Sequence, residues 1–140
     1  MGMKTLANHI IAVAQQNEKS INKYKLEKIM YFTLKIANEN NLITQNELES
    51  IYNEPFLLYF YSPKLISQSE RFKIFQSAPI IGNEFEISPE LNKFNPIILK
   101  YLEKPVMDIV KESRQTPFWK RNSRYLNGIK SDIPYGLDDL

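Results

Sequence analysis

The chain contains no cysteine and only one histidine, His9, among its 140 residues. The absence of cysteine excludes disulfide bonds, thiolate metal sites and a cysteine nucleophile. Zinc sites normally draw several ligands from histidine and cysteine, so a single histidine argues against a metal centre. We therefore expect no metal and no other cofactor.

Long apolar runs and clustered glycines are also missing. No stretch approaches the roughly 18 consecutive apolar residues that a membrane span requires. The N-terminus lacks the apolar core and cleavage site of a secretory signal, so we expect a cytoplasmic protein with no membrane partner. The four glycines are far apart in the sequence, which excludes a glycine-rich phosphate loop.

A strong excess of one charge is absent as well. The formal net charge of +2 is too small to indicate nucleic-acid binding by itself. The hydrophobic content of 43% and the charged content of 24% are ordinary for a globular chain, and 140 residues suffice to bury a core. We expect one helical domain over residues 1–125, followed by a loop-rich tail over residues 126–140.

The spacing of apolar residues predicts a mainly helical fold of about six or seven short helices. The first helix is expected over residues 5–16 and the second over residues 23–39, with Asn22 as its N-cap. Thr44 followed by Glu47 is a capping-box pattern, which predicts a short helix to about residue 52. Further helices are expected over about residues 64–75, 89–102 and 105–113, where prolines mark several of the starts.

Two segments are expected to be extended. Phe56–Tyr61 is a continuous aromatic and aliphatic run, which favours a buried strand-like segment over a helix. Because this run is too apolar to stay exposed on a monomer, a partner groove or a homodimer seam is the alternative. Residues 79–86, with a turn at Gly82-Asn83, predict a small hairpin or an extended excursion.

The second helix has two distinct faces. Leu26, Ile29 and Met30 belong to an apolar stripe that predicts burial in the core. The opposite side carries two tyrosines and two lysines: Tyr24, Lys28, Tyr31 and Lys35. A solvated helix face seldom needs two tyrosines, so this side is expected to contact either another part of the fold or a partner.

Two segments of the chain resemble motifs of a known family. Lys25–Phe32 resembles the "KLQKLLYYAQ" signature of the SocA-like antitoxin family, also called the Panacea domain. Tyr59–Pro63 is similar to the aromatic "YGP" segment of that family, with Ser62 in place of the glycine.

A third motif lies later in the chain. Ser113–Trp119 resembles the family's "SHxExPW" segment, with Arg114 in place of the histidine and Thr116 in place of the acid. Together the three motifs extend the resemblance over roughly residues 5–125.

The resemblance implies a non-enzymatic protein that neutralises a toxin by direct contact in the cytoplasm of a bacterial host, often encoded by a phage or mobile element. Helix geometry selects a first contact face of Tyr24, Lys28, Tyr31 and Lys35. The family signature also selects two of these residues, Lys28 and Tyr31. A second predicted contact set comprises Tyr61, Pro63, Arg114 and Trp119.

Two other functions remain open. The same scaffold could serve a phage-encoded inhibitor of a bacterial defence nuclease, such as a CRISPR effector. A DNA-binding regulator is the other alternative, because aromatics near Trp119 alternate with cations, a mixture that suits base stacking and phosphate neutralisation. The cations in question are Lys120, Arg121 and Arg124.

Catalysis is not expected from the titratable residues. His9 has no recognisable catalytic partner, so a surface or hydrogen-bonded core histidine is the better interpretation. The carboxylates of Glu47 and Glu49 lie two residues apart, and such positions diverge by about 200° on a helix. We therefore do not expect an enzyme.

Overall fold

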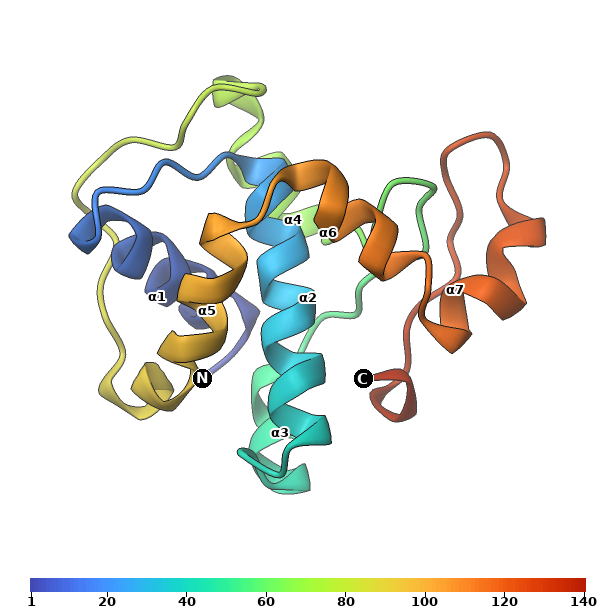
Figure 1. Ribbon diagram of the computed structural model, residues 1–140, viewed down its shortest axis with the longest axis horizontal. Coiled ribbons are helices and arrows are strands. Elements are labelled where there is room, and N and C mark those ends of the chain that lie inside the picture. Colours follow the sequence, from blue (N-terminus) through green and yellow to red (C-terminus); the bar gives the residue numbers. More distant parts are fainter.

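The computed structural model describes residues 1–140 and confirms the mainly helical fold class, with seven α-helices (Figure 1). The α-helices are α1 (Met3–Gln16), α2 (Lys23–Glu39), α3 (Gln45–Ile51), α4 (Ile66–Arg71), α5 (Asn95–Glu103), α6 (Val106–Ser113) and α7 (Pro117–Asn122). Four short 3₁₀-helices complete the regular structure: η1 (Lys73–Phe75), η2 (Pro89–Phe94), η3 (Ser123–Tyr125) and η4 (Leu137–Asp139).

The predicted caps set the starts of α2 and α3. The Asn22 side chain accepts a hydrogen bond from the Lys25 N–H at 2.9 Å, as expected for an N-cap. Thr44 and Glu47 form the predicted capping box at the start of α3. Both caps satisfy N–H groups that have no partner inside the helix, which fixes where each helix begins.

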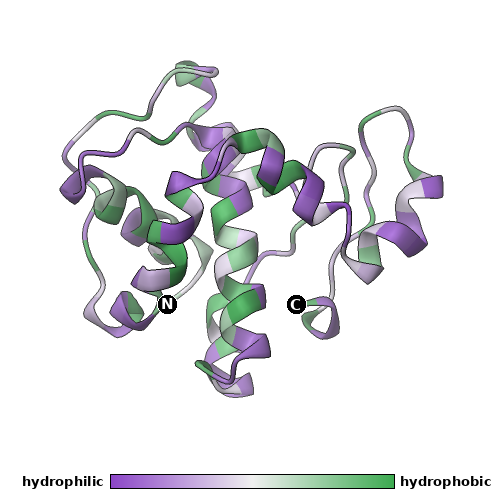
Figure 2. Cartoon of the chain, viewed as in Figure 1, coloured by the Kyte–Doolittle hydropathy of each residue, from purple (hydrophilic) through white to green (hydrophobic).

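Helix α2 lies at the centre of the molecule. In Figure 1, α1 and α5 lie on one side of it, and α7 and the C-terminus lie on the other. Every residue from 26 to 34 is buried, so the helix is covered around its whole circumference. Figure 2 shows hydrophobic residues along the middle of α2 and on the parts of α1 and α5 beside it, with more hydrophilic outer loops.

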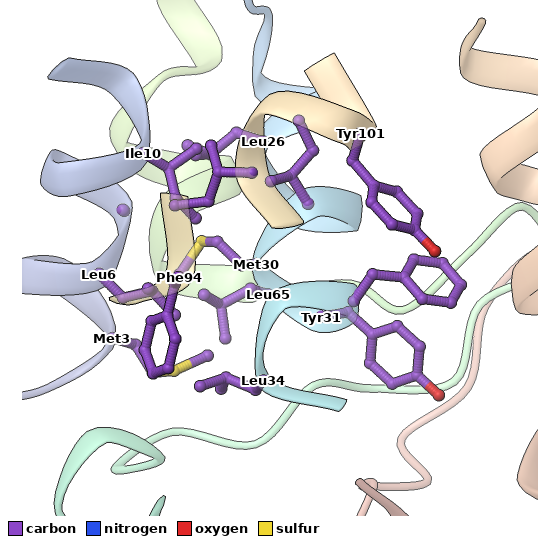
Figure 3. Close-up of a cluster of buried hydrophobic side chains, with 14 of the residues drawn as sticks. Met3, Leu6, Ile10, Leu26, Met30, Tyr31, Leu34, Leu65, Phe94 and Tyr101 are labelled. Carbon is purple, nitrogen blue, oxygen red and sulfur yellow. The ribbon is translucent and has the colours of Figure 1, made fainter. Parts of the chain in front are cut away.

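The two sides of α2 pack differently. Figure 3 shows Met30 and Tyr31 pointing to opposite sides of the helix, with Met30 among the side chains of α1. On the other side, the Tyr31 ring meets the rings of Phe56 and Tyr135 at centroid distances of 5.6 and 5.3 Å. These edge-to-face contacts build an aromatic second half of the core.

The extended segment Phe56–Tyr61 changes character along its length. In its first half, Phe56 and Leu58 are buried as predicted, and the Leu58 N–H donates to the Ile133 carbonyl at 2.8 Å. Its second half is not, because Phe60 and Tyr61 are 38% and 51% exposed. The prediction of a fully buried segment is therefore wrong for these last two residues.

Residues 126–140 return to the core rather than forming a free tail. The Tyr135 N–H donates to the Phe56 carbonyl at 2.8 Å, and the Tyr135 side chain is only 1% exposed. Asn38 holds the other end of the segment through a 2.9 Å hydrogen bond to the Leu140 carbonyl. Pro134 disfavours a helix here, but an extended segment still turns alternate side chains towards the core, and Tyr135 is buried in this way.

Residues 79–86 form an extended excursion without strand pairing. The Ile80 N–H donates to the Ile21 carbonyl at 2.8 Å, which ties the segment to the start of α2. Gly82 has a φ of 128°, a value that glycine adopts readily. Of the two predictions for this segment, the extended excursion is therefore the one observed.

None of the helices has the length and apolar character that a membrane crossing needs.

Candidate functional site

The largest cavity, of about 410 Å³, lies at the N-terminal end of α2, against residues 59–64 and the turn at residues 129–130. Three tyrosines and three lysines line it, and we call it the tyrosine–lysine pocket: Tyr24, Tyr59, Tyr61, Lys28, Lys64 and Lys130. Its volume falls in the range of about 300–1,000 Å³ that is usual for ligand sites. Four of the predicted contact residues line this cavity: Tyr24, Lys28, Tyr61 and Pro63.

Glu27 forms part of the pocket wall and is 2% exposed. Its Oε1 accepts a 2.7 Å hydrogen bond from the Leu65 N–H, which ties the segment before α4 to α2. Burial raises the pKa of Glu27 to about 6, against the opposing effect of the positive charges of Lys64 and Lys28.

Lys28 is 5% exposed and has few partners for its charge. Its ammonium donates to the Tyr24 carbonyl at 3.3 Å and forms no ion pair. Burial lowers the pKa of Lys28 to about 8, while the negative charge of Glu27 acts in the opposite direction. The amine is therefore still mostly protonated at pH 7, and an ammonium group has three donors to satisfy.

The remaining lysines of the pocket lie nearer to solvent. The Lys64 ammonium is 6.0 Å from the Tyr24 ring centroid and 5.7 Å from the Tyr59 ring centroid, within reach of cation–π attraction. Lys130 is exposed at the edge. The lining residues include three lysines and two carboxylates, Glu27 and Glu70, so their formal charges sum to one positive charge.

A second group of side chains adjoins the pocket. The Arg114 guanidinium lies 4.1 Å from the Phe60 ring, 5.7 Å from the Tyr61 ring and 5.8 Å from the Trp119 ring. We call these four residues the Arg114 cluster: Phe60, Tyr61, Arg114 and Trp119. Tyr61 belongs to both the cluster and the pocket, so the two form one continuous surface.

Hydrogen bonds to the backbone hold the Arg114 cluster in place. Arg114 Nε donates to the Phe60 carbonyl at 2.9 Å, and Trp119 Nε1 donates to the Tyr59 carbonyl at 3.2 Å. The structure thus brings together three residues of the second predicted contact set. The fourth, Pro63, is buried and lines the adjoining tyrosine–lysine pocket.

The first predicted contact face does not exist as an exposed surface. Tyr31 is 0% exposed, because Phe56 and Tyr135 cover this side of α2, so another part of the fold and not a partner contacts it there. Lys35 is paired with Glu39 at 2.8 Å, one turn along the same helix. Only Tyr24, at 41% exposure, lies at the surface, so the first predicted contact face packs against the rest of the fold for most of its length.

The basic residues of the DNA-binding alternative lie outside the pocket. Lys120 and Arg121 are on α7 and Arg124 is on η3, and all three are exposed. Arg121 lies 3.6 Å from an Asp139 carboxylate oxygen, while the Arg124 guanidinium is 5.0 Å from the Tyr125 ring. Lys120 and Arg124 form no ion pair.

His9 is a buried histidine with both ring nitrogens satisfied. Nδ1 accepts a 3.0 Å hydrogen bond from the Ser88 N–H, so the proton is on Nε2, which lies 2.8 Å from the Asn95 side-chain oxygen. Burial lowers the pKa of His9, against the effects of this hydrogen bond and of Glu90. No group of three histidine, aspartate or glutamate side chains gathers where it could hold a metal ion.

Sequence reasoning missed two parts of the site. Glu27 lies three residues after Tyr24 and four before Tyr31, so the helical spacing that selected the first contact face also placed Glu27 beside it. Phe60 carried no such signal, because its exposure depends on where the chain turns after residue 58.

Comparison of the chain with known protein families, curated proteins and solved structures found no match.

Proposed function

We propose that this chain is a non-enzymatic protein-binding module that neutralises a toxin by covering its active surface. The observation that supports this proposal most directly is the Arg114 cluster, which presents Phe60 and Tyr61 to solvent beside a cavity. Tyrosine, tryptophan and arginine are enriched among the residues that contribute most to protein–protein binding.

The cluster is also fixed before any partner arrives. The bonds from Arg114 and Trp119 to backbone carbonyls restrain both long side chains. A surface that is already ordered loses less side-chain entropy on association, so more of its contact energy appears as affinity. This rigidity favours a binding surface over a flexible, solvated one.

The family resemblance supports neutralisation as the purpose of the binding. Its third motif carries Arg114 where the family has a histidine, and Arg114 is the side chain around which the exposed rings gather. The departure from the motif therefore falls on the proposed contact surface. We infer that this member keeps the antitoxin mode of action and differs in its partner.

Affinity capture from the native host tests the proposal. The wild-type protein should retain a partner in stoichiometric amount, and co-expression should relieve the toxicity of that partner. A Tyr61→Ala/Arg114→Ala variant should lose both effects, whereas Ile74→Ala, at a side chain 82% exposed outside this surface, should keep them. Equal capture by both variants would overturn the proposal, and capture of a defence nuclease would assign the inhibitor function instead.

A DNA-binding function is the second candidate, because Lys120 and Arg124 are exposed cations without carboxylate partners. Neutralising phosphates releases counterions, so such binding would weaken steeply as salt concentration rises. Measurement of duplex DNA affinity at two salt concentrations tests it. Binding that disappears in a Lys120→Gln/Arg124→Gln variant would support this function, and no binding at low salt would exclude it.

A further inference from the structure

We propose that the tyrosine–lysine pocket binds the carboxylate of an acidic side chain on the partner protein. This inference rests on the proposed function, because it assigns a specific ligand to the cavity beside the Arg114 cluster. The pocket contains an unpaired positive charge, carries a net positive charge along its lining and has tyrosine side chains in its walls.

The first step is the state of Lys28. A buried ammonium is costly unless hydrogen bonds and an opposite charge compensate it. Lys28 has one long hydrogen bond, to the Tyr24 carbonyl, and no ion pair. Its neighbour Glu27 directs Oε1 to the Leu65 N–H instead. An incoming carboxylate would supply the acceptor and the charge that Lys28 lacks.

The second step concerns the charge of the ligand. Three lysines and two carboxylates line the pocket, so a single negative charge is enough to balance it. This charge balance favours a singly charged carboxylate over a phosphate group, which carries between about one and two negative charges at pH 7.

The third step concerns the shape of the pocket. The side chains of Tyr24, Tyr59 and Tyr61 give it apolar walls that suit the methylene groups of an acidic side chain. Lys64 lies near two of these rings, where cation–π attraction restrains its ammonium. The pocket is therefore built for a ligand with a short apolar stem and an anionic end.

The last step places the pocket on the binding surface. Tyr61 lines the cavity and also contacts Arg114, so a partner resting on the Arg114 cluster would reach the mouth of the pocket. The charged residues at this boundary include Arg114, Lys64 and Lys130. An acidic patch on the partner would complement them, and one of its side chains would enter the pocket.

The experiment measures binding of small carboxylates to the intact chain by NMR. The probes are N-acetyl-glutamate amide, N-acetyl-glutamine amide, N-acetylglycine and inorganic phosphate. The glutamate probe should shift the resonances of residues 24–28 and 59–65, and the glutamine probe should not. Lys28→Met should weaken glutamate binding by about tenfold, as expected for loss of a charge-assisted hydrogen bond. Lys130→Gln, at an exposed position, should weaken it by about threefold.

Several results would overturn the proposal. Equal shifts from the glutamate and glutamine probes would show that charge is not recognised. Stronger binding of phosphate would assign the site to phosphate, and stronger binding of N-acetylglycine would assign it to a chain terminus. Unchanged affinity in both lysine variants would place the bound carboxylate elsewhere.

The test separates this inference from the proposed function. If glutamate binds the pocket and no partner is captured, the carboxylate site stands and the neutraliser function fails. If a partner is captured equally well by wild type and Lys28→Met, and Tyr61→Ala/Arg114→Ala still abolishes capture, the function stands and the carboxylate inference fails.

Discussion

The two sides of helix α2 differ in what covers them. On one side, α1 and α5 supply mainly aliphatic side chains, such as Leu6 and Ile10, in helix-to-helix packing (Figure 3). On the other side, irregular segments supply aromatic rings, including Phe56 and Tyr135. Regular packing follows from local periodicity, whereas the aromatic side depends on segments far apart in the sequence.

The largest expected effect comes from breaking the aromatic side. Phe56→Ala removes a ring that is 0% exposed and should lower the free energy of unfolding by about 3–5 kcal/mol. Leu6→Ala, on the aliphatic side, should cost about 2–5 kcal/mol by the same mechanism. Urea denaturation of both variants measures this directly. A loss below about 1 kcal/mol for Phe56→Ala would show that the irregular segments are peripheral.

A stabilising substitution is expected at the pocket. Lys28→Met removes a buried charge without an ion-pair partner and should raise the free energy of unfolding by about 1–3 kcal/mol at pH 7. The pKa of Lys28 is lowered in the folded state, to about 8, so its charged form opposes folding. Above the pKa of the unfolded chain, near 10.5, Lys28 is neutral in both states and the full stability is present. This stability is lost as the pH falls through the pKa of the folded state, about 8.

Denaturation of wild type and Lys28→Met at pH 7 and pH 10 checks this sign. The difference between the two proteins should shrink as the pH rises. A variant less stable than wild type at pH 7 would mean that Lys28 stabilises the fold, and the view of the pocket as a site that sacrifices stability for binding would be wrong.

Acid should lower the free energy of unfolding through His9, a buried residue of α1. Its pKa is lowered by burial, so the unfolded chain takes up a proton first, and stability falls as the pH drops below about 6.5. Glu27 has the opposite effect. Its pKa is raised to about 6, so its contribution to the free energy of unfolding grows as the pH falls from about 6 towards 4.5. A His9→Gln variant isolates the histidine.

The comparison needs unfolding curves for wild type and His9→Gln at pH 7.5 and pH 5.5. Wild type should lose more stability between these two values than the variant does. Equal losses would show that His9 is as easily protonated in the folded chain as in the unfolded one.

The smallest expected effect distinguishes the ring of Tyr31 from its hydroxyl. The buried hydroxyl has no hydrogen-bond partner within the protein, while the ring packs on Phe56 and Tyr135. Tyr31→Phe should therefore leave the free energy of unfolding unchanged or raise it by up to about 1 kcal/mol. A thermal denaturation series that showed a clear loss instead would indicate a hidden partner for this hydroxyl.

The contrast between the two sides also explains what the sequence could predict. The caps at Asn22 and Thr44 are local, so the starts of α2 and α3 followed from neighbouring residues. The burial of Tyr31 depends on Phe56 and Tyr135, at sequence separations of 25 and 104 residues, and no local pattern reveals such contacts. Periodicity alone therefore left open whether the fold or a partner covers this side of α2.

The candidate site shows the same division. Tyr24 and Lys28 could be selected from helical spacing, and Arg114 and Trp119 from a motif that resembles one in a known family. Their meeting around Tyr61 requires the chain to turn after residue 58 and to return at residue 129, which is a property of the tertiary fold. The sequence thus predicted most of these residues, but not the surface that they form together.

The central claim is that the surface around Tyr61 and Arg114 binds a protein partner. The most direct test is a titration of the captured partner against wild type and the Tyr61→Ala/Arg114→Ala variant, with helix content monitored in both. We predict unchanged helix content and an affinity lower by at least about tenfold in the variant. Equal affinities for two equally folded proteins would contradict the claim.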